Sequence, residues 1–157
     1  MLKSLAPIAL AAAVLGLFVP AVRADEEADK KAREAATEFM NALKAESIEG
    51  VLKVAGVPFY EDGHQVIAER DGVEKLVRDL FEKEDLSSVK FEISKVHAFE
   101  DVREKFSEAK RDLLKGVMAD GDRVVQFTLD DDGQKEEEFL VLVRLREGTA
   151  KVVGVED

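Results

Sequence analysis

The apolar positions in the first half of the chain repeat at helical spacing. Over residues 28–45 they fall at steps of four, three and four, at Ala32, Ala36, Phe39 and Leu43. This spacing places the four side chains on one face of a helix. A second, shorter helix is expected over residues 47–55, because Ser47 can cap its first turn and Gly56 followed by Pro58 ends it.

Two further helices follow from the same periodicity. Residues 71–83 combine an N-terminal cap at Asp71 with apolar residues at helical spacing, namely Val73, Leu76, Val77, Leu80 and Phe81. Residues 101–115 carry one apolar stripe, made by Val102, Phe106, Ala109 and Leu113. Gly116 is placed to end this fourth helix.

The second half of the chain alternates between apolar and polar residues, which is typical of β-strands. Strands are expected over residues 89–99, 123–129, 137–146 and 149–155. The strand at 137–146 is apolar on both faces over its middle, because Leu140 and Leu142 lie opposite the face of Phe139, Val141, Val143 and Leu145. We therefore expect this strand to be central and covered on both sides.

The alternation over residues 89–99 changes phase. Val89, Phe91 and Ile93 share one face of a regular strand, whereas Val96 and Ala98 share the other. A bulge near residues 94–95 would bring both apolar sets to the same side. Without a bulge His97 lies on the face of Phe91, and with one it faces away from the core.

The stretch PFYEDGHQ, residues 58–65, gathers a phenol, two carboxylates and one of the two histidines, a composition found in many acid–base sites. The dipeptide DG between extended segments is also a strong hairpin signal. We expect Glu61 to pair with His64 across the turn. Strand pleating then puts Phe59 on an apolar face and Tyr60 on the other. Because Tyr60 points away from Glu61 and His64, we interpret the stretch as a turn rather than an active site.

The beginning of the chain has the pattern of a secretory signal peptide. An early cation, Lys3, precedes an uncharged run over residues 4–21, and Val22 and Ala24 are small residues of the kind found before a cleavage site. We expect cleavage after Ala24, export to the periplasm or the exterior, and one domain over residues 25–157. The alternative is an uncleaved membrane anchor, which is disfavoured by the short run and by Pro7, Gly16 and Pro20 within it.

Composition narrows the range of partners. The net charge is −11, and it becomes −13 without residues 1–24, because Lys3 and Arg23 are lost and no acid is. So acidic a protein is repelled by phosphate backbones and anionic lipid headgroups, and we expect no nucleic-acid partner and no membrane contact after cleavage. The chain has no cysteine, which excludes a lipid anchor at a cysteine and leaves the core without disulfides.

The sequence lacks recognisable metal, cofactor and nucleophile motifs. LDDDGQKEEEF, residues 129–139, suggests a calcium loop, but with Gly133 at the sixth position the first and twelfth positions are Thr128 and Phe139. We expect a solvated turn instead. His64 with one nearby carboxylate supplies too few ligands for a metal. Without a cysteine nucleophile, a serine nucleophile elbow or a glycine-rich phosphate loop, no cofactor is expected.

Three stretches resemble a known superfamily: FMNALKAESIEGVL at 39–52, PFYEDG at 58–63 and LVRLREGTAKVVGVED at 142–157. Together with the order of elements, they look like small exported members of the nuclear transport factor two-like, or cystatin-like, superfamily. The resemblance implies an α+β fold in which a strongly curved antiparallel sheet wraps around a long N-terminal helix. The resulting cone has an open end that is a pocket in many relatives. The helix at 101–115 is additional and could cap or fill that mouth.

The superfamily includes ketosteroid isomerases, dehydratases, polyketide cyclases and members without any reaction, so the resemblance does not assign a function. The isomerase pattern needs a tyrosine donor and an aspartate base that meet in the pocket. Here the only tyrosine, Tyr60, lies in the hairpin, and no strand aspartate stands in an apolar stretch. No catalytic residue is carried over.

Three functions stay open. The leading one is a non-catalytic exported domain that binds a small apolar molecule or a protein partner, with Tyr60, His64 and His97 as candidate ligand-binding residues. The second is an isomerase, lyase or cyclase-like enzyme in which His97 is the catalytic base. The third is self-association of the sheet into a homodimer through Leu140 and Leu142. A buried His97 beside a polar group in an apolar cavity would favour the enzyme, and a cavity filled by Phe and Leu would favour protein binding.

Overall fold

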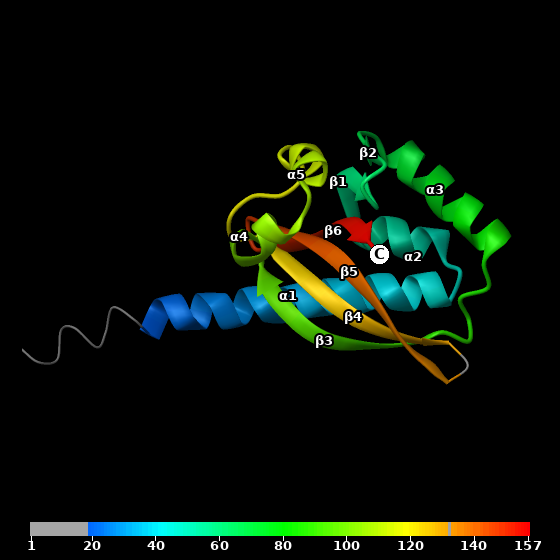
Figure 1. The fold of residues 1–157 in the computed structure, drawn as a ribbon, viewed down its shortest axis with the longest axis horizontal. Helices are drawn as coiled ribbons and strands as arrows, with labels where there is room; N and C mark the ends of the chain where they lie inside the picture. The colour runs from blue at the N-terminus through cyan, green and yellow to red at the C-terminus, as the bar shows by residue number, and fades with distance from the viewer. Residues whose placement is uncertain (1–18, 132) are drawn as a thin grey trace, which may run out of the picture.

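The computed structural model describes residues 19–131 and 133–157, so most of the predicted signal segment lies outside it. A long helix, a short helix and a hairpin are followed by a third helix and by strands that flank a helical arm, residues 99–118 (Figure 1). The elements are α1 Val19–Lys44, α2 Ile48–Val54, β1 Ala55–Glu61, β2 Gln65–Ile67, α3 Arg70–Lys83, β3 Lys90–Ala98, α4 Phe99–Val102, the 3₁₀ turn η1 Arg103–Lys105, α5 Glu108–Leu114, β4 Arg123–Asp131, β5 Gln134–Arg146 and β6 Thr149–Glu156.

The strands form one six-stranded sheet in the order β2-β1-β6-β5-β4-β3, which is not closed into a barrel. This confirms the expected α+β class with a long N-terminal helix. One pair departs from the expected antiparallel arrangement, because β1 runs parallel to β6. Strands joined by a tight hairpin must be antiparallel, whereas β1 and β6 come from distant parts of the chain and are free to run in the same direction.

The two faces of the sheet are covered by different parts of the chain. On one face α1 packs against β3, β4, β5 and β6, and the arm lies on the other (Figure 1). Val141 and Val143 of β5 belong to the α1-side core, and Leu142 belongs to the arm-side core. The prediction of a central strand covered on both faces is therefore confirmed. Because the chain's own arm buries Leu142 completely, that side chain is not exposed to a second copy.

Of the two alternatives for β3, the one with a bulge is observed. The pairing of β3 with β4 shifts register between Ile93 and Lys95, so Phe91, Ile93 and Val96 all pack toward the α1-side core. The shift sends His97 to the opposite face. That face is covered by the arm, so His97 is half-buried rather than fully exposed.

The hairpin forms, but its predicted register is wrong by one residue. Asp62 and Gly63 adopt positive φ values of 36° and 67°, and the His64 N–H donates to the Glu61 carbonyl at 2.8 Å. The ladder nevertheless resumes one position later, with Glu61 opposite Gln65. This register seats Ile67 beside Phe59 in the α1-side core and leaves Val66 opposite Tyr60, in the arm-side core.

The expected helix over residues 101–115 is broken in two. Phe106 has an extended backbone, and Ser107 starts a new helix by accepting a hydrogen bond from the Lys110 N–H at 3.3 Å. The break changes the helical phase, so Ala109 is exposed while Leu114 is buried. The single stripe expected to include Ala109 is therefore wrong. In α3 the cap also differs, because Asp71 lies inside the first turn rather than before it.

A buried arginine fastens the start of α1 to the sheet. Arg123 is 4% exposed, and its Nε donates to Asp29 at 2.6 Å while its Nη2 donates to Asp25 at 3.1 Å. The helix begins at Val19, earlier than the expected residue 28, so the predicted cleavage position after Ala24 lies within it. Both acids that hold Arg123 lie after that position.

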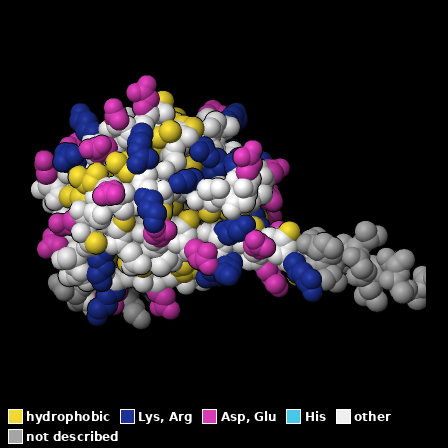
Figure 2. All heavy atoms as spheres, turned by 180° about the vertical axis from the view of Figure 1, so that it is seen from behind, with side chains coloured by type: hydrophobic (Ala, Val, Ile, Leu, Met, Phe, Trp, Pro, Cys, Tyr) yellow, Lys and Arg dark blue, Asp and Glu magenta, His cyan; other side chains and the backbone are white. Residues whose placement is uncertain are grey.

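The molecular surface is strongly charged. On the face seen in Figure 2, cationic and acidic side chains are interspersed, with apolar atoms showing between them. No helix within residues 19–131 or 133–157 is long and apolar enough to cross a bilayer.

Candidate functional site: a pocket beneath the helical arm

A pocket of about 340 Å³ opens between the arm and the second face of the sheet. Its apolar walls come from both layers: Val102 and Phe106 from the arm, and Val124 and Leu140 from the sheet. The break at Ser107 helps to form this space, because the extended residue Phe106 and the α5 residue Lys110 both line it. The pocket therefore depends on the helical arm, the segment that is additional to the fold implied by the resemblance.

Glu156 and the partly buried Lys110 line the floor of the pocket, and they form a polar cluster with Tyr60, which lies buried behind Glu156. The Tyr60 hydroxyl donates to Glu156 Oε2 at 2.5 Å, and Tyr60 itself has no exposed surface. The other carboxylate oxygen of Glu156 accepts a hydrogen bond from the Lys110 ammonium group. Glu156 is 5% exposed, and its carboxylate is satisfied by two donors, one from β1 and one from α5.

Burial and the neighbouring carboxylate act together on Tyr60. Removal of the phenol from water raises its pKa, and the hydrogen bond to Glu156 raises that pKa further, because both disfavour the phenolate. Tyr60 is therefore a neutral hydrogen-bond donor at physiological pH. It positions Glu156 and does not itself line the pocket.

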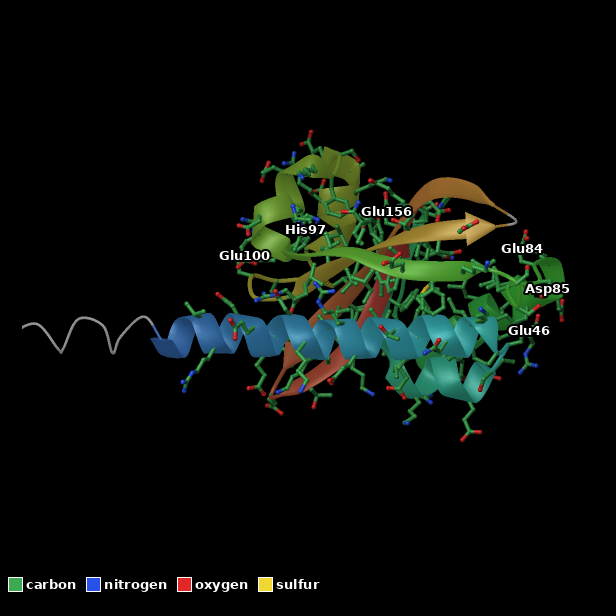
Figure 3. All side chains as sticks on the ribbon, turned by 90° about the horizontal axis from the view of Figure 1, so that it is seen from below. Glu46, Glu84, Asp85, His97, Glu100 and Glu156 are labelled. Carbon is green, nitrogen blue, oxygen red and sulfur yellow. The ribbon has the colours of Figure 1, made fainter. Side chains whose placement is uncertain are left out.

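His97 lines the pocket beside a second polar group. Its Nε2 lies 3.2 Å from Oε1 of Gln126, which is on the neighbouring strand β4. If Nε2 carries the proton, it donates to the amide oxygen and leaves Nδ1 as an acceptor. Figure 3 shows His97 and Glu156 on the side of β3 and β4 that carries α4 and α5, away from α1.

The three candidate ligand-binding residues therefore occupy different environments. His97 lines the pocket, Tyr60 lies buried behind Glu156, and His64 is exposed in the β1–β2 turn. No group of three or more histidines and acids with metal-ligand geometry occurs among the described residues. The site is thus an amphipathic pocket with a hydrogen-bonded floor.

Glu156 and Lys110 were not anticipated from the sequence. Glu156 ends an apolar strand and Lys110 sits among other charged residues of a helix, so neither has a local pattern that marks it. The indication that was available is the unpaired hydroxyl of Tyr60, since a tyrosine on a covered sheet face needs a partner for its O–H group.

The interior of the cone, between α1 and the sheet, is filled by aromatic side chains. Phe39, Phe59 and Phe127 are each at most 3% exposed, and the rings of Phe39 and Phe59 lie 6.4 Å apart. Phe91 meets Phe127 edge to face at 5.8 Å. Core packing therefore fills the space around these rings between α1 and the sheet, and His97 lies on the opposite face of the sheet.

Comparison with known proteins identifies the fold. No protein-family model matches the chain, and no curated protein is a significant match. A ketosteroid isomerase-like protein from Erwinia carotovora atroseptica superposes with a TM-score of 0.51 at 14% identity, covering 81% of this chain and 92% of that one. A cystatin-like fold protein of unknown function from Nostoc punctiforme gives 0.52 at 10% identity, over 80% and 86% of the two chains. The chain has a nuclear transport factor two-like, or cystatin-like, fold, as the resemblance implied.

Proposed function

We propose that residues 25–157 form an exported, non-catalytic binding domain whose ligand is a small, largely apolar molecule held beneath the arm. The observation that carries this proposal is the pocket of about 340 Å³, in which four apolar side chains from the arm and the sheet lie among polar and charged residues. Its volume lies at the lower end of the range of small-molecule sites, which is about 300–1,000 Å³. The fold alone supports no narrower assignment.

The polar lining favours a ligand whose single polar group is neutral. Two cations, Lys105 and Lys110, stand against three acids, so the signs are mixed and no large field of one sign is present; the acids are Glu138, Glu156 and Asp157. His97 and Gln126 together offer both a donor and an acceptor. A hydroxyl, carbonyl or amide group on an apolar body matches this lining.

A fluorescent titration with N-phenyl-1-naphthylamine, a neutral apolar probe, tests the proposal. We expect saturable binding of one molecule per chain. Leu140→Trp places an indole in the pocket and should weaken binding about tenfold or more, because it fills the space that the probe needs. Ala109→Trp adds the same side chain at an exposed position of α5 outside the pocket, and it should leave binding unchanged. If the two substitutions change the affinity for the probe equally, the probe does not bind in the pocket beneath the arm.

The second candidate is an isomerase, lyase or cyclase-like enzyme in which His97 acts as a base. It is favoured by the position of His97 at the pocket wall beside Gln126. An amide is a weaker orienting group than a carboxylate for a catalytic histidine, which is why binding is preferred. If His97→Ala leaves the turnover of candidate ketone, lactone and hydroxy-acid substrates and the affinity for the probe unchanged, this candidate is refuted.

A protein partner and a homodimer stay open as further proposals. A protein would dock on the arm or across the pocket mouth, since Leu142 is already covered within the chain. Sedimentation equilibrium at high concentration tests the homodimer, and a monomer there would exclude it.

A further inference from the structure

A second concave surface, the basic groove, lies away from the pocket beneath the arm. It is lined by four cationic side chains against one acid, and its lining residues are Lys115, Gly116, Val117, Met118, Ala119, Arg144, Arg146, Glu147, Thr149 and Lys151. Its volume is about 570 Å³. Such an excess of cations is unusual for a chain whose net charge is −11, in which Asp and Glu outnumber Lys and Arg by 34 to 23.

Two of the cations face each other across neighbouring strands. Arg144 of β5 is the direct partner of Lys151 in β6. Like charges at opposed positions of an antiparallel pair are destabilising, so the sheet places this pair together at a cost. Arg146 lies two residues further along β5, on the same face, and therefore about 7 Å from Arg144.

The charges of Arg144 and Lys151 are not neutralised within the described part of the chain. Arg144 Nη2 donates to the Val57 carbonyl at 2.9 Å, and Lys151 Nζ donates to the Lys53 carbonyl at 2.7 Å. Neither forms an ion pair with a carboxylate of the described residues, whereas Arg146 is paired with the buried Asp122 and Lys115 with the exposed Asp112. A carbonyl accepts a hydrogen bond but does not cancel the charge, so the Arg144–Lys151 pair keeps a strong attraction for an anion.

The local backbone is adapted to this arrangement. A Cβ atom added at Gly56 would lie 3.2 Å from Arg144 Nη2 and 3.0 Å from the Cβ of Lys151. The absence of a side chain at residue 56 therefore leaves room for both cations to lie side by side above the first strand. Both are partly buried, which lowers the screening of their charges by water and salt.

We propose that the basic groove binds a small molecule that carries at least two anionic groups, either phosphates or carboxylates. The lining supports two groups, because one can engage Arg144 and Lys151 while the second engages Lys115, whose exposed ion pair with Asp112 can give way to the ligand, or the exposed side of Arg146. The guanidinium fork of Arg144 suits the two oxygens of either group. This site is independent of the pocket beneath the arm and of its proposed ligand.

Calorimetric titration at low ionic strength, with pyrophosphate and with citrate as probes, tests the proposal and separates the two chemistries. We expect at least one of them to bind with a Kd below about 1 mM, and inorganic phosphate and acetate to bind more weakly. Arg144→Gln and Lys151→Gln should each weaken binding about tenfold. Lys30→Gln removes the same charge from an exposed position on α1 and should change the Kd less than about twofold.

Circular dichroism tests whether each variant is folded. If Arg144→Gln is not folded, Arg144→Lys, which keeps the charge, replaces it. Arg144→Lys should weaken binding less than Lys151→Gln, since the charge remains and only the fork is lost. The proposal is overturned if neither probe binds below about 1 mM, or if Lys30→Gln weakens binding as much as Lys151→Gln.

Discussion

The hydroxyl of Tyr60 donates a 2.5 Å hydrogen bond to Glu156, although 96 positions of the sequence separate the two residues. The contact joins β1 to the end of β6, which are parallel neighbours in the sheet. Lys110 completes the cluster from the arm. These two contacts of Glu156 thus link the hairpin, the last strand and the arm that covers the pocket.

Tyr60→Phe removes the donor and leaves the Glu156 carboxylate buried with one partner fewer. We predict a loss of about 1.5–3 kcal/mol in the free energy of unfolding, the range for hydrogen bonds to charged groups. Urea denaturation measures it. The control is Gln65→Ala, which removes an exposed hydrogen bond to Glu61 in the same hairpin and should cost less than about 0.5 kcal/mol. Similar losses in the two variants would contradict the buried cluster.

Tyr60 is the only tyrosine, so its ionisation can be followed by absorbance without interference from another. Its pKa is raised by burial and by Glu156, and we predict no phenolate signal near pH 10 in the folded protein. In urea the phenol should titrate near its ordinary value of about 10. A phenolate signal at that pH in folded protein would show that Tyr60 is exposed.

The same shift makes stability depend on pH. The folded chain keeps the phenol proton where the unfolded chain loses it, so the unfolded state binds fewer protons above about pH 10. The contribution of Tyr60 is complete below that pH and declines as the pH rises above it. We predict that the difference in the free energy of unfolding between the wild-type protein and Tyr60→Phe shrinks as the pH rises from about 8 to about 11. A difference that grows over this interval would contradict a raised pKa for Tyr60 in the folded protein.

Asp122 is the second buried acid, and it holds the loop between the arm and β4. It accepts hydrogen bonds from the Ala119 N–H at 2.8 Å and the Leu145 N–H at 3.0 Å, and from Arg146. We predict that Asp122→Ala costs about 3 kcal/mol or more, because two backbone N–H groups lose their acceptor. Asp120→Ala, two positions away and exposed, should cost less than about 1 kcal/mol. Thermal or urea unfolding distinguishes them.

The contacts of Arg123 locate the start of the folded domain. A chain that begins at Asp25 retains both acids that bind Arg123, and we predict a stability equal to that of the full-length chain. A chain that begins at residue 30 lacks both and should lose about 1–3 kcal/mol, because the buried guanidinium loses its charged acceptors. Equal stability of the two truncated chains would remove the structural role of Asp25 and Asp29.

Local pattern predicted most of the fold, because helical and strand periodicity reflect which face each element buries. The phase change in the alternation located the bulge before His97 as one of two alternatives, because a bulge brings both apolar sets to the same side. The hairpin register was missed because DG specifies the turn but not whether pairing resumes at His64 or Gln65. The break at Ser107 was missed because the apolar spacing of Val102 and Phe106 continues at helical intervals to Ala109.

The site was less predictable than the fold. His97 was singled out by its residue type and by a strand expected to line the cone, whereas it lines the pocket beneath the arm on the other face of the sheet. Glu156 and Lys110 acquire their role only through long-range contacts. Glu156 lies 96 positions from Tyr60 and 46 positions from Lys110, the two residues that donate hydrogen bonds to it. No local pattern encodes such long-range pairing.

The central claim is that ligand binds beneath the arm and not inside the cone. The most direct measurement is a map of amide chemical-shift changes in a ¹⁵N-labelled chain titrated with N-phenyl-1-naphthylamine. We predict that the largest shifts fall at His97, Val102, Phe106, Gln126 and Leu140, which line the pocket. Largest shifts at Phe39, Phe59 and Phe127, which fill the cone, would contradict the claim.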